Sequence, residues 1–307
     1  MYNISIIVCT FNRATFLKSC LESIYTHNTN LELFEVIVID NNSTDDTSSV
    51  VKDFFNRYTN FRSFIEQRQG LSHARNRGSV EASSDWLLFL DDDGVVFDST
   101  IQIAIRNTNS REFSCFGGVY LPNHLQGKRN WTHYSDGSNI YTQEYFGELK
   151  NPKYASGGIF LIKKEVLMHV GGFNCSIGMN GMKIAYGEET NLQEKIRSAG
   201  YKIAFDPSLR ILHFYPLKKQ TLKWMVESNF ANGRDSWVTF RRSISPFQIF
   251  LLFAKLATLP IWTIAKAAYL SKKRRYHPIR FFYQVFAYVA YTFGKLKVSA
   301  SKIKQSS

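Results

Sequence analysis

Three consecutive carboxylates, Asp91–Asp93, directly follow the apolar run Trp86–Leu90. Carboxylates at adjacent positions repel one another unless a cation or solvent relieves the charge. Hard divalent ions such as Mg²⁺ and Mn²⁺ take oxygen ligands and commonly bind through one or two carboxylates together with substrate phosphates. Asp also favours turns, so an ordinary turn is the competing interpretation. The triplet therefore predicts either a turn or a divalent-metal site that receives a phosphorylated ligand.

Polar residues also follow two earlier apolar, β-branched runs. Thr10–Arg13 comes after Ile4–Cys9, and Asp40–Asp45 comes after Phe34–Ile39. Such runs are typical of strands that are buried on both faces of a parallel sheet. Ligands of open α/β sheets bind beyond the carboxyl ends of the strands. We therefore expect all three polar segments at one edge of a sheet, a convergence that turn chemistry alone explains poorly.

The elements that must position these residues alternate between strands and helices. Beyond the three runs above, strands are predicted at 62–66, 113–120, 159–162, 201–205 and 209–213. Helices are predicted at 14–25, after Ser43, and at 72–82, 163–170 and 188–199. Residues 121–152, which are polar and aromatic, are predicted to form a loop over the site. This alternation predicts an α/β fold, a doubly wound, mostly parallel sheet with helices on both faces.

The positive charge of the chain is concentrated at its C-terminal end. There are 38 Lys and Arg against 25 Asp and Glu, a net charge of +13, yet residues 241–307 hold 13 basic residues and no acidic one. The preceding residues are therefore balanced, which excludes a uniformly basic nucleic-acid binder. Four scattered cysteines predict neither a disulfide framework nor a zinc site and favour a reducing compartment. No secretory signal peptide is predicted, because a strand-like run follows Met1 almost at once.

Several ordered motifs together resemble a known family. They are Ile6–Arg13, Val36–Asp45, Gly70–Gly78 and Phe89–Asp93, followed by Ala155–Gly158, Gly187–Leu192 and a final His213. Over about residues 3–215 the chain resembles the family 2 glycosyltransferases. The resemblance implies the GT-A fold and an enzyme that inverts the anomeric centre of a sugar in a single displacement. The chain lacks the Gly-rich motif G-x-x-x-x-G-K-[ST], which argues against a P-loop NTPase. It also lacks G-x-G-x-x-G, which argues against a classical dinucleotide dehydrogenase.

The resemblance also implies how the donor, a nucleotide-diphospho-sugar, is bound. Asp40 would hydrogen-bond the base of the nucleotide. UDP is favoured as the nucleotide, and dTDP and GDP stay open. The full set of residues implied to bind the donor is Thr10, Asn12, Arg13, Asp40, Asn42, Arg75, Asn76, Asp91 and Asp92. Asp91 and Asp93 match the outer positions of the family's D-x-D motif and, with His213, would hold Mn²⁺ or Mg²⁺. A lone histidine there is otherwise an ordinary strand-end residue.

A single displacement needs a base to remove the proton of the acceptor hydroxyl. The family usually places a Gly-Glu-Asp sequence where this chain has Gly187, Glu188 and Glu189. Glu189 is predicted as the base, with Glu188 orienting or replacing it; both could instead only cap a helix. Gly157, Gly158 and the loop residue Trp131 are predicted near the donor or acceptor sugar. A tight turn is the competing interpretation of the two glycines.

The C-terminal part is predicted to be a basic, aromatic, α-helical appendage. The predicted domains are a catalytic domain over 1–215, a connecting amphipathic helix over 216–244 and a membrane-associating region over 245–307. The favoured partner of 245–307 is an anionic membrane surface, because its apolar runs are too short to span. A short spanning hairpin and a packed helical pair are the alternatives. Gln220–Trp224 only partly matches the Q-x-x-R-W motif of processive synthases, so processivity is not expected.

The sequence thus predicts a metal-dependent inverting glycosyltransferase. Its acceptor would be a glycan or a lipid-linked saccharide in the assembly of a surface polysaccharide. The protein would lie in the cytoplasm, peripherally attached to the inner face of the cell membrane, and would bind no nucleic acid. The alternatives are a nucleotidyltransferase on a similar sheet and a catalytically silent membrane-associated scaffold, which would be expected to have lost the acidic clusters.

Overall fold

The computed structural model describes residues 2–27, 30–127, 142–181, 183–239, 245–271 and 278–303. The chain divides into two compact units. The first comprises Met1–Asn123, Gly137–Met182 and Glu188–Phe214, and the second comprises His124–Asp136, Lys183–Gly187 and Tyr215–Ser307. Phe214 ends the first unit close to the predicted boundary, but the short segment Lys183–Gly187 groups with the C-terminal helices. The three predicted domains themselves stay a prediction.

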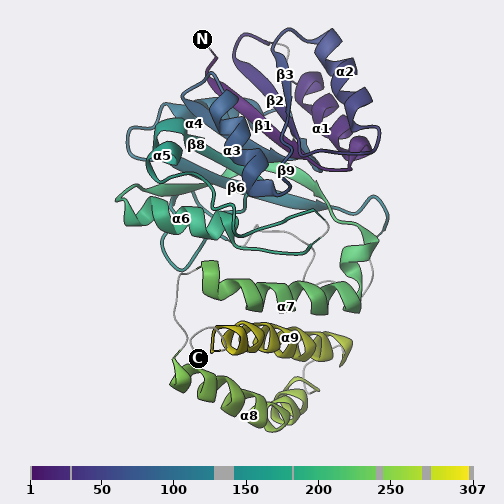
Figure 1. Cartoon of the computed structure of the whole chain (residues 1–307), viewed down its shortest axis with the longest axis vertical. Coiled ribbons are helices and arrows are strands. Elements are labelled where there is room, and N and C mark those ends of the chain that lie inside the picture. The colour runs from purple at the N-terminus through teal and green to yellow at the C-terminus, as the bar shows by residue number, and fades with distance from the viewer. Residues whose placement is uncertain are drawn as a thin grey trace. The chain divides into compact units, whose positions relative to one another are not determined.

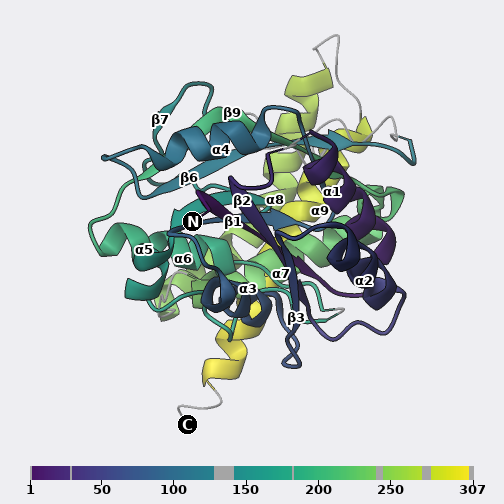
Figure 2. The same ribbon diagram turned by 90° about the horizontal axis from the view of Figure 1, so that it is seen from above.

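The first unit is a mixed α/β structure (Figures 1 and 2). Its strands are β1 (Ile4–Thr10), β2 (Phe34–Asp40), β3 (Phe61–Ile65), β4 (Trp86–Asp91), β5 (Gly94–Val96), β6 (Cys115–Asn123), β7 (Gly147–Glu148), β8 (Ile159–Lys163) and β9 (Ile203–Phe214). Its helices are α1 (Ala14–His27), α2 (Thr47–Arg57), α3 (Leu71–Glu81), α4 (Thr100–Thr108), α5 (Lys164–His169) and α6 (Glu188–Ser198). The predicted α/β fold is therefore confirmed.

The register of the sheet brings the polar strand ends together. The strand order is β3-β2-β1-β4-β8-β6-β9-β5, with β7 paired to β9. Strand β1 runs parallel to both β2 and β4, and its last residues pair Thr10 with Asp40 and Cys9 with Asp91. Strand β5 runs antiparallel to β9 and pairs Gly94 with His213. The polar residues after β1, β2 and β4 therefore lie at one edge, as predicted.

Helices cover both faces of the sheet. One buried cluster joins the sheet to α1, α2 and α4 through residues such as Leu17, Phe54 and Ile101. The other joins the opposite face to α3, α5 and α6 through residues such as Ala74 and Leu192. Strands β1 and β2 are buried on both faces, as their uninterrupted apolar sequences predict. Two apolar layers thus fix the sheet whose edge carries the polar residues.

The structure corrects the predicted strands near the end of the first unit. The two short strands predicted at 201–205 and 209–213 form the single long strand β9. Asp206 and Pro207 lie inside it, where the register between β6 and β9 shifts. This irregularity accommodates a proline that lacks an N–H, and the Asp206 carboxylate accepts the N–H of Ser208 at 2.9 Å. The predicted loop 121–152 is also interrupted by the short strand β7.

The C-terminal part of the second unit, as far as the structure describes it from residue 217 on, is almost entirely helical, as predicted for the appendage. It contains the 3₁₀ turn Leu217–Gln220 and the helices α7 (Leu222–Thr239), α8 (Pro246–Ser271) and α9 (Pro278–Ile303), shown in Figure 1. Helices α7 and α9 meet backbone to backbone, because a Cβ on Gly233 would lie 1.9 Å from the Tyr291 carbonyl oxygen. A Cβ on Gly294 would likewise lie 2.0 Å from the Phe230 carbonyl oxygen. None of the described helices is long and apolar enough to cross a membrane.

Candidate active site

Two carboxylates and an imidazole meet where β4 ends. The Nε2 atom of His213 lies 3.1 Å from Oδ1 of Asp93 and 4.0 Å from Oδ2 of Asp91. One ligand atom from each of the three residues lies within 4.8 Å of the others. The pairing of β5 with β9 produces this contact, and the Phe214 N–H donates to the Asp93 carbonyl at 3.1 Å. The structure therefore gathers the three residues that the sequence predicted as metal ligands.

The chemistry of this cluster fits a divalent cation. Two carboxylates with one imidazole form a mixed oxygen and nitrogen donor set that suits Mn²⁺ and related ions. The Asp93 side chain is only 2% exposed, whereas that of Asp91 is 32% exposed. The buried Nδ1 of His213 has no hydrogen-bond partner among the described residues. A cation would offset the negative charge that burial leaves poorly solvated.

Asp92 points to the first strand instead of joining the cluster. Its carboxylate accepts hydrogen bonds from the Thr10 hydroxyl at 2.8 Å and from Arg13 at 2.7 Å. The other terminal nitrogen of Arg13 binds Asp93. Burial raises the pKa of Asp92 to about 7, against the opposing effect of the Arg13 charge. The middle carboxylate of the triplet thus ties the first polar segment to the third.

The predicted nucleotide pocket is built from two interlocked turns. The Asn12 side-chain oxygen accepts the Thr44 N–H at 2.7 Å, and Asp40 accepts the Ser43 N–H at 2.8 Å. Asn12 and Asn42 have φ values of 53° and 65°, the left-handed region that Asn tolerates better than most residues. The turns after β1 and β2 therefore hold each other in place. Asp40 is a buried residue, 8% exposed.

Arg75 joins the acidic triplet to the acidic pair at the start of α6. Its side chain is 3% exposed, and its terminal nitrogens lie 3.3 Å from both Asp91 Oδ1 and Glu189 Oε1. Glu188 Oε1 lies 3.7 Å away. The guanidinium also stacks over the Phe173 ring at 5.3 Å. One buried cation thus faces three carboxylates from two segments that are far apart in the sequence.

The two glutamates differ in their access to solvent. The side chain of Glu188 is 4% exposed and that of Glu189 is 28% exposed. Oε2 of Glu188 has no hydrogen-bond partner among the described residues and lies against Gly178, where a Cβ would come within 2.6 Å of it. Burial, followed by the neighbouring charge of Glu189, raises the pKa of Glu188. Glu188 is therefore enclosed, whereas Glu189 can be reached.

Gly157 and Gly158 allow the two acidic clusters to approach each other. A Cβ on Gly157 would lie 2.3 Å from Glu189 Oε1 and 2.8 Å from Arg75. A Cβ on Gly158 would lie 3.0 Å from Asp91 Oδ2. A side chain at 157 would displace the ends of Glu189 and Arg75, and one at 158 would crowd Asp91. The Gly157 carbonyl also accepts a long hydrogen bond from Arg75 at 3.5 Å. Trp131, the third residue predicted near a sugar, lies outside the described residues.

A family model described as Glycosyl transferase family 2 matches residues 5–171, slightly more than half of the chain. The chain belongs to glycosyl transferase family 2. This stretch contains the acidic triplet, Arg75 and the two glycines, and it ends before the acidic pair. The sequence-based recognition of the family is therefore confirmed.

Curated relatives of this family 2 member include two enzymes of lipid-linked glycan synthesis. One, the GalNAc(5)-diNAcBac-PP-undecaprenol beta-1,3-glucosyltransferase of Campylobacter jejuni, is 34% identical over 39% of this chain and 39% of its own length. Another, the glucosyl-dolichyl phosphate glucuronosyltransferase of Haloferax volcanii, is 22% identical over 75% of each chain. The chain spans less than two thirds of the length of the first curated relatives that it matches.

A solved structure supports the GT-A fold of this family 2 chain. The mannosyltransferase PcManGT from Pyrobaculum calidifontis, in complex with GDP-Man and Mn²⁺, has a TM-score of 0.66. It is 20% identical, and the match covers 96% of this chain and 87% of that one. The likeness at this identity concerns the fold.

Three residues that sequence reasoning missed support the site of the family 2 chain. The Asn41 side chain donates to the carbonyls of Glu66 and Arg68 at 2.9 and 2.8 Å, which fixes the segment before α3. The Gln193 amide accepts the N–H of Ala155 and donates to its carbonyl, both at 2.8 Å. Phe173 stacks on Arg75, as described above. Gln193 follows Glu189 by four residues on α6, so its helical spacing was an available signal.

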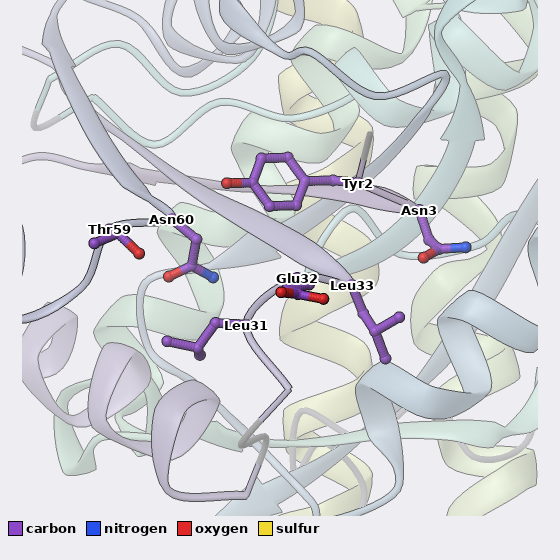
Figure 3. Close-up of a pocket in the computed structure, with 7 residues that line it drawn as sticks. All are labelled: Tyr2, Asn3, Leu31, Glu32, Leu33, Thr59 and Asn60. Atoms are coloured by element: carbon purple, nitrogen blue, oxygen red, sulfur yellow. The ribbon is translucent and has the colours of Figure 1, made fainter.

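Asn76 has a different environment from its predicted neighbour Arg75. Its side-chain amide donates to the Phe173 carbonyl and accepts the Phe173 N–H, both at 2.9 Å. Asn76 therefore anchors the residue that stacks on Arg75, and its contact with a nucleotide stays a prediction. A surface cavity of about 660 Å³ lies elsewhere, at the amino ends of β1 to β3 (Figure 3). Its lining contains none of the predicted site residues: it consists of Tyr2, Asn3, Leu31, Glu32, Leu33, Thr59 and Asn60.

Proposed function

We propose that the chain is a metal-dependent inverting glycosyltransferase, which moves a sugar from a nucleotide-diphospho-sugar to an acceptor hydroxyl. The observation that carries the proposal is the contact of one buried cation, Arg75, with both Asp91 and Glu189. It brings a candidate metal cluster and a candidate base to the same edge of the sheet. Membership of glycosyl transferase family 2 supports the reaction class.

The donor would bind between the turn after β2 and the acidic triplet. Asp40 would accept a hydrogen bond from the base, and Arg13 would meet the diphosphate. Asp91, Asp93 and His213 would hold the metal ion, which when bound supplies Lewis-acid stabilisation of the departing nucleoside diphosphate. Structures of similar fold contain GDP-Man with Mn²⁺ and UDP with Mn²⁺, which supports Mn²⁺ while leaving Mg²⁺ and the base of the nucleotide to experiment.

Glu189 is the stronger candidate for the base. As the acceptor oxygen attacks the anomeric carbon, the bond from that carbon to the diphosphate oxygen breaks, and Glu189 takes the hydroxyl proton. The Glu189 side chain is 28% exposed, so an acceptor can reach it, whereas that of Glu188 is enclosed at 4%. Glu189 also lies in the first turn of α6, 3.3 Å from the Arg75 guanidinium, which holds its carboxylate in place.

The acceptor would be a glycan or a lipid-linked saccharide at an anionic membrane surface. Helix α8 supports this location because it carries several large apolar side chains that are exposed to solvent. They are Phe247, Phe250, Leu251, Phe253, Ile261, Trp262 and Tyr269. The basic, acid-free sequence 241–307 adds the charge that attracts anionic lipid. Two of the curated relatives have names that include a lipid carrier, undecaprenol or dolichyl phosphate, and these names support the same class of acceptor.

A donor screen tests the reaction. The purified full chain is incubated with Mn²⁺ or Mg²⁺ and a panel of nucleotide-sugars, and released nucleoside diphosphate is measured. Release with at least one donor, dependent on the ion, is expected. Pyrophosphate release from a nucleoside triphosphate and a sugar phosphate would identify a nucleotidyltransferase instead. Failure of every donor either to bind or to turn over would leave the silent scaffold.

Vesicle flotation tests the location. The double variant Phe250→Ser with Trp262→Ser should float less with vesicles containing anionic lipid, because two exposed aromatic side chains are lost from α8. Phe55→Ser is the matched control, since Phe55 is also exposed, at 60%, but belongs to the first unit. Equal flotation of all three proteins would contradict membrane binding through α8.

A further inference from the structure

The segment that leads into the candidate catalytic glutamates is held by helix α7. Residues Lys183–Gly187 belong to the second unit together with α7, although both flanking segments belong to the first. Gly187 is joined by a peptide bond to Glu188, the first residue of α6. Any force that fixes Gly187 therefore acts within one or two residues of Glu188 and Glu189.

An arginine and an aspartate of α7 bind the main chain of this segment. The Arg234 guanidinium donates to Asp235 at 2.6 and 2.8 Å and also to the Ile184 carbonyl at 3.0 Å. The Asp235 carboxylate accepts the Tyr186 N–H at 3.0 Å. The charged pair thus satisfies a carbonyl and an N–H two residues apart, much as a neighbouring strand would.

Further contacts extend this clamp on both sides of the pair. The hydroxyl groups of Tyr186 and Ser228 lie 2.8 Å apart. Gly187 has a φ of 105°, and a Cβ there would lie 1.9 Å from Thr239 Oγ1. Glycine is therefore required at 187 both by its backbone conformation and by the close approach of α7. Ala185, between the bonded residues, is 7% exposed.

We propose that Arg234 and Asp235 are positioning residues, which set Glu188 and Glu189 for catalysis by holding segment 184–187. The proposal rests on the proposed function, since it assumes that these glutamates act on the acceptor. It gives α7 a role in turnover, separate from any attachment through α8. A positioning residue acts through geometry, and a displacement of about 1 Å can cost on the order of a hundredfold in rate.

Steady-state kinetics of Asp235→Leu tests this role. We expect kcat to fall by about tenfold to a hundredfold while the donor KM and calorimetric donor affinity stay at wild-type values. Asp235→Asn keeps an oxygen for the Tyr186 N–H and should recover much of the rate. Glu227→Leu is the matched control, because Glu227 lies on α7 in an exposed i,i+4 pair with Lys223. A wild-type kcat in Asp235→Leu, or an equal loss in Glu227→Leu, would overturn the proposal.

Hydrogen exchange provides a readout that does not need turnover. The Tyr186 amide should be protected in the wild type, and it should exchange faster in Asp235→Leu, together with amides of the first turn of α6. Unchanged exchange there would overturn the proposal even if the rate fell. If the wild type turned over no donor, the proposed function would fail, while the exchange result would still decide whether Asp235 of α7 holds segment 184–187. If Asp235→Leu does not fold, the double variant Tyr186→Phe with Ser228→Ala removes only the contact between the two hydroxyl groups. Its kcat and its hydrogen exchange are then compared with those of the wild type in the same way.

Discussion

The acidic triplet after β4 and the acidic pair at the start of α6 are built from similar parts. Each contains an enclosed carboxylate, Asp92 or Glu188, whose pKa is raised by burial. Each also faces an arginine. The clusters differ in how accessible that arginine is: the Arg13 side chain is 36% exposed and the Arg75 side chain is 3% exposed.

This difference assigns different tasks to the two clusters. A partly exposed arginine can turn toward an incoming anion, and its partner Asp93 belongs to the cluster that would hold a metal ion together with Asp91 and His213. A buried arginine between Glu189 and Asp91 cannot exchange its partners at low cost. The triplet is therefore suited to binding a charged donor, and the pair to holding one carboxylate in a fixed place.

Removing a carboxylate from the triplet should have the largest effect on activity. Asp93→Ala should lower metal-dependent turnover by about four orders of magnitude, because several kcal/mol of charge stabilisation are lost. Calorimetry should show that metal-dependent donor binding is lost as well. Asp53→Ala, which removes an exposed carboxylate on α2, should behave as wild type. Donor binding that survives in Asp93→Ala would remove the triplet from the donor site.

The pair should respond in the opposite way. Glu189→Gln should keep donor and metal affinity but lower kcat by about 10²–10⁴, the usual contribution of a general base. Binding calorimetry and single-turnover kinetics separate the two effects. Full activity in Glu189→Gln, with loss in Glu188→Gln, would transfer the base to Glu188 and reverse the assignment based on exposure.

The two arginines should differ in stability. Arg75→Met leaves three carboxylates facing one another in a largely buried site and should cost about 3–5 kcal/mol of unfolding free energy. Arg13→Met should cost less, about 1–3 kcal/mol, because water can follow the partly exposed Arg13 side chain into the space that it vacates beside Asp92 and Asp93. Urea denaturation measures both. Equal losses would mean that accessibility does not distinguish the clusters.

Most of the fold, and the convergence of the polar strand ends, could be predicted from the sequence, because both depend on local patterns. Uninterrupted apolar strands ending in polar residues placed Thr10, Asp40 and Asp91 at one edge, as the register confirms. The single strand β9 was missed, because Asp206 and Pro207 are typical of a turn and only the pairing with β6 keeps them in a strand.

What the sequence could not supply was the set of contacts between distant residues. The resemblance implied that Arg75 binds the nucleotide, but it did not predict that Arg75 is buried among carboxylates. That burial depends on Glu189, which is more than a hundred residues away in the sequence. The contacts of Asp235 with the segment before Glu188 have the same origin. Neither has a local pattern, because ion pairs across a fold leave no periodic signal in the chain.

The enclosed member of the pair should make the stability of the protein depend on pH. Burial and the Glu189 charge raise the pKa of Glu188 to about 8, whereas an unfolded glutamate titrates near 4.5. The folded state then binds more protons than the unfolded state between these values, so this residue lowers stability as the pH rises through that range. Glu188→Gln cannot ionise and should escape this loss. Its melting temperature should stay close to that of the wild type at pH 5 and exceed it clearly at pH 8.5, because each unit of pKa difference between the folded and unfolded states corresponds to about 1.4 kcal/mol. Calorimetry at the two pH values decides the matter: a constant difference between the proteins would show that Glu188 keeps the same charge at both pH values.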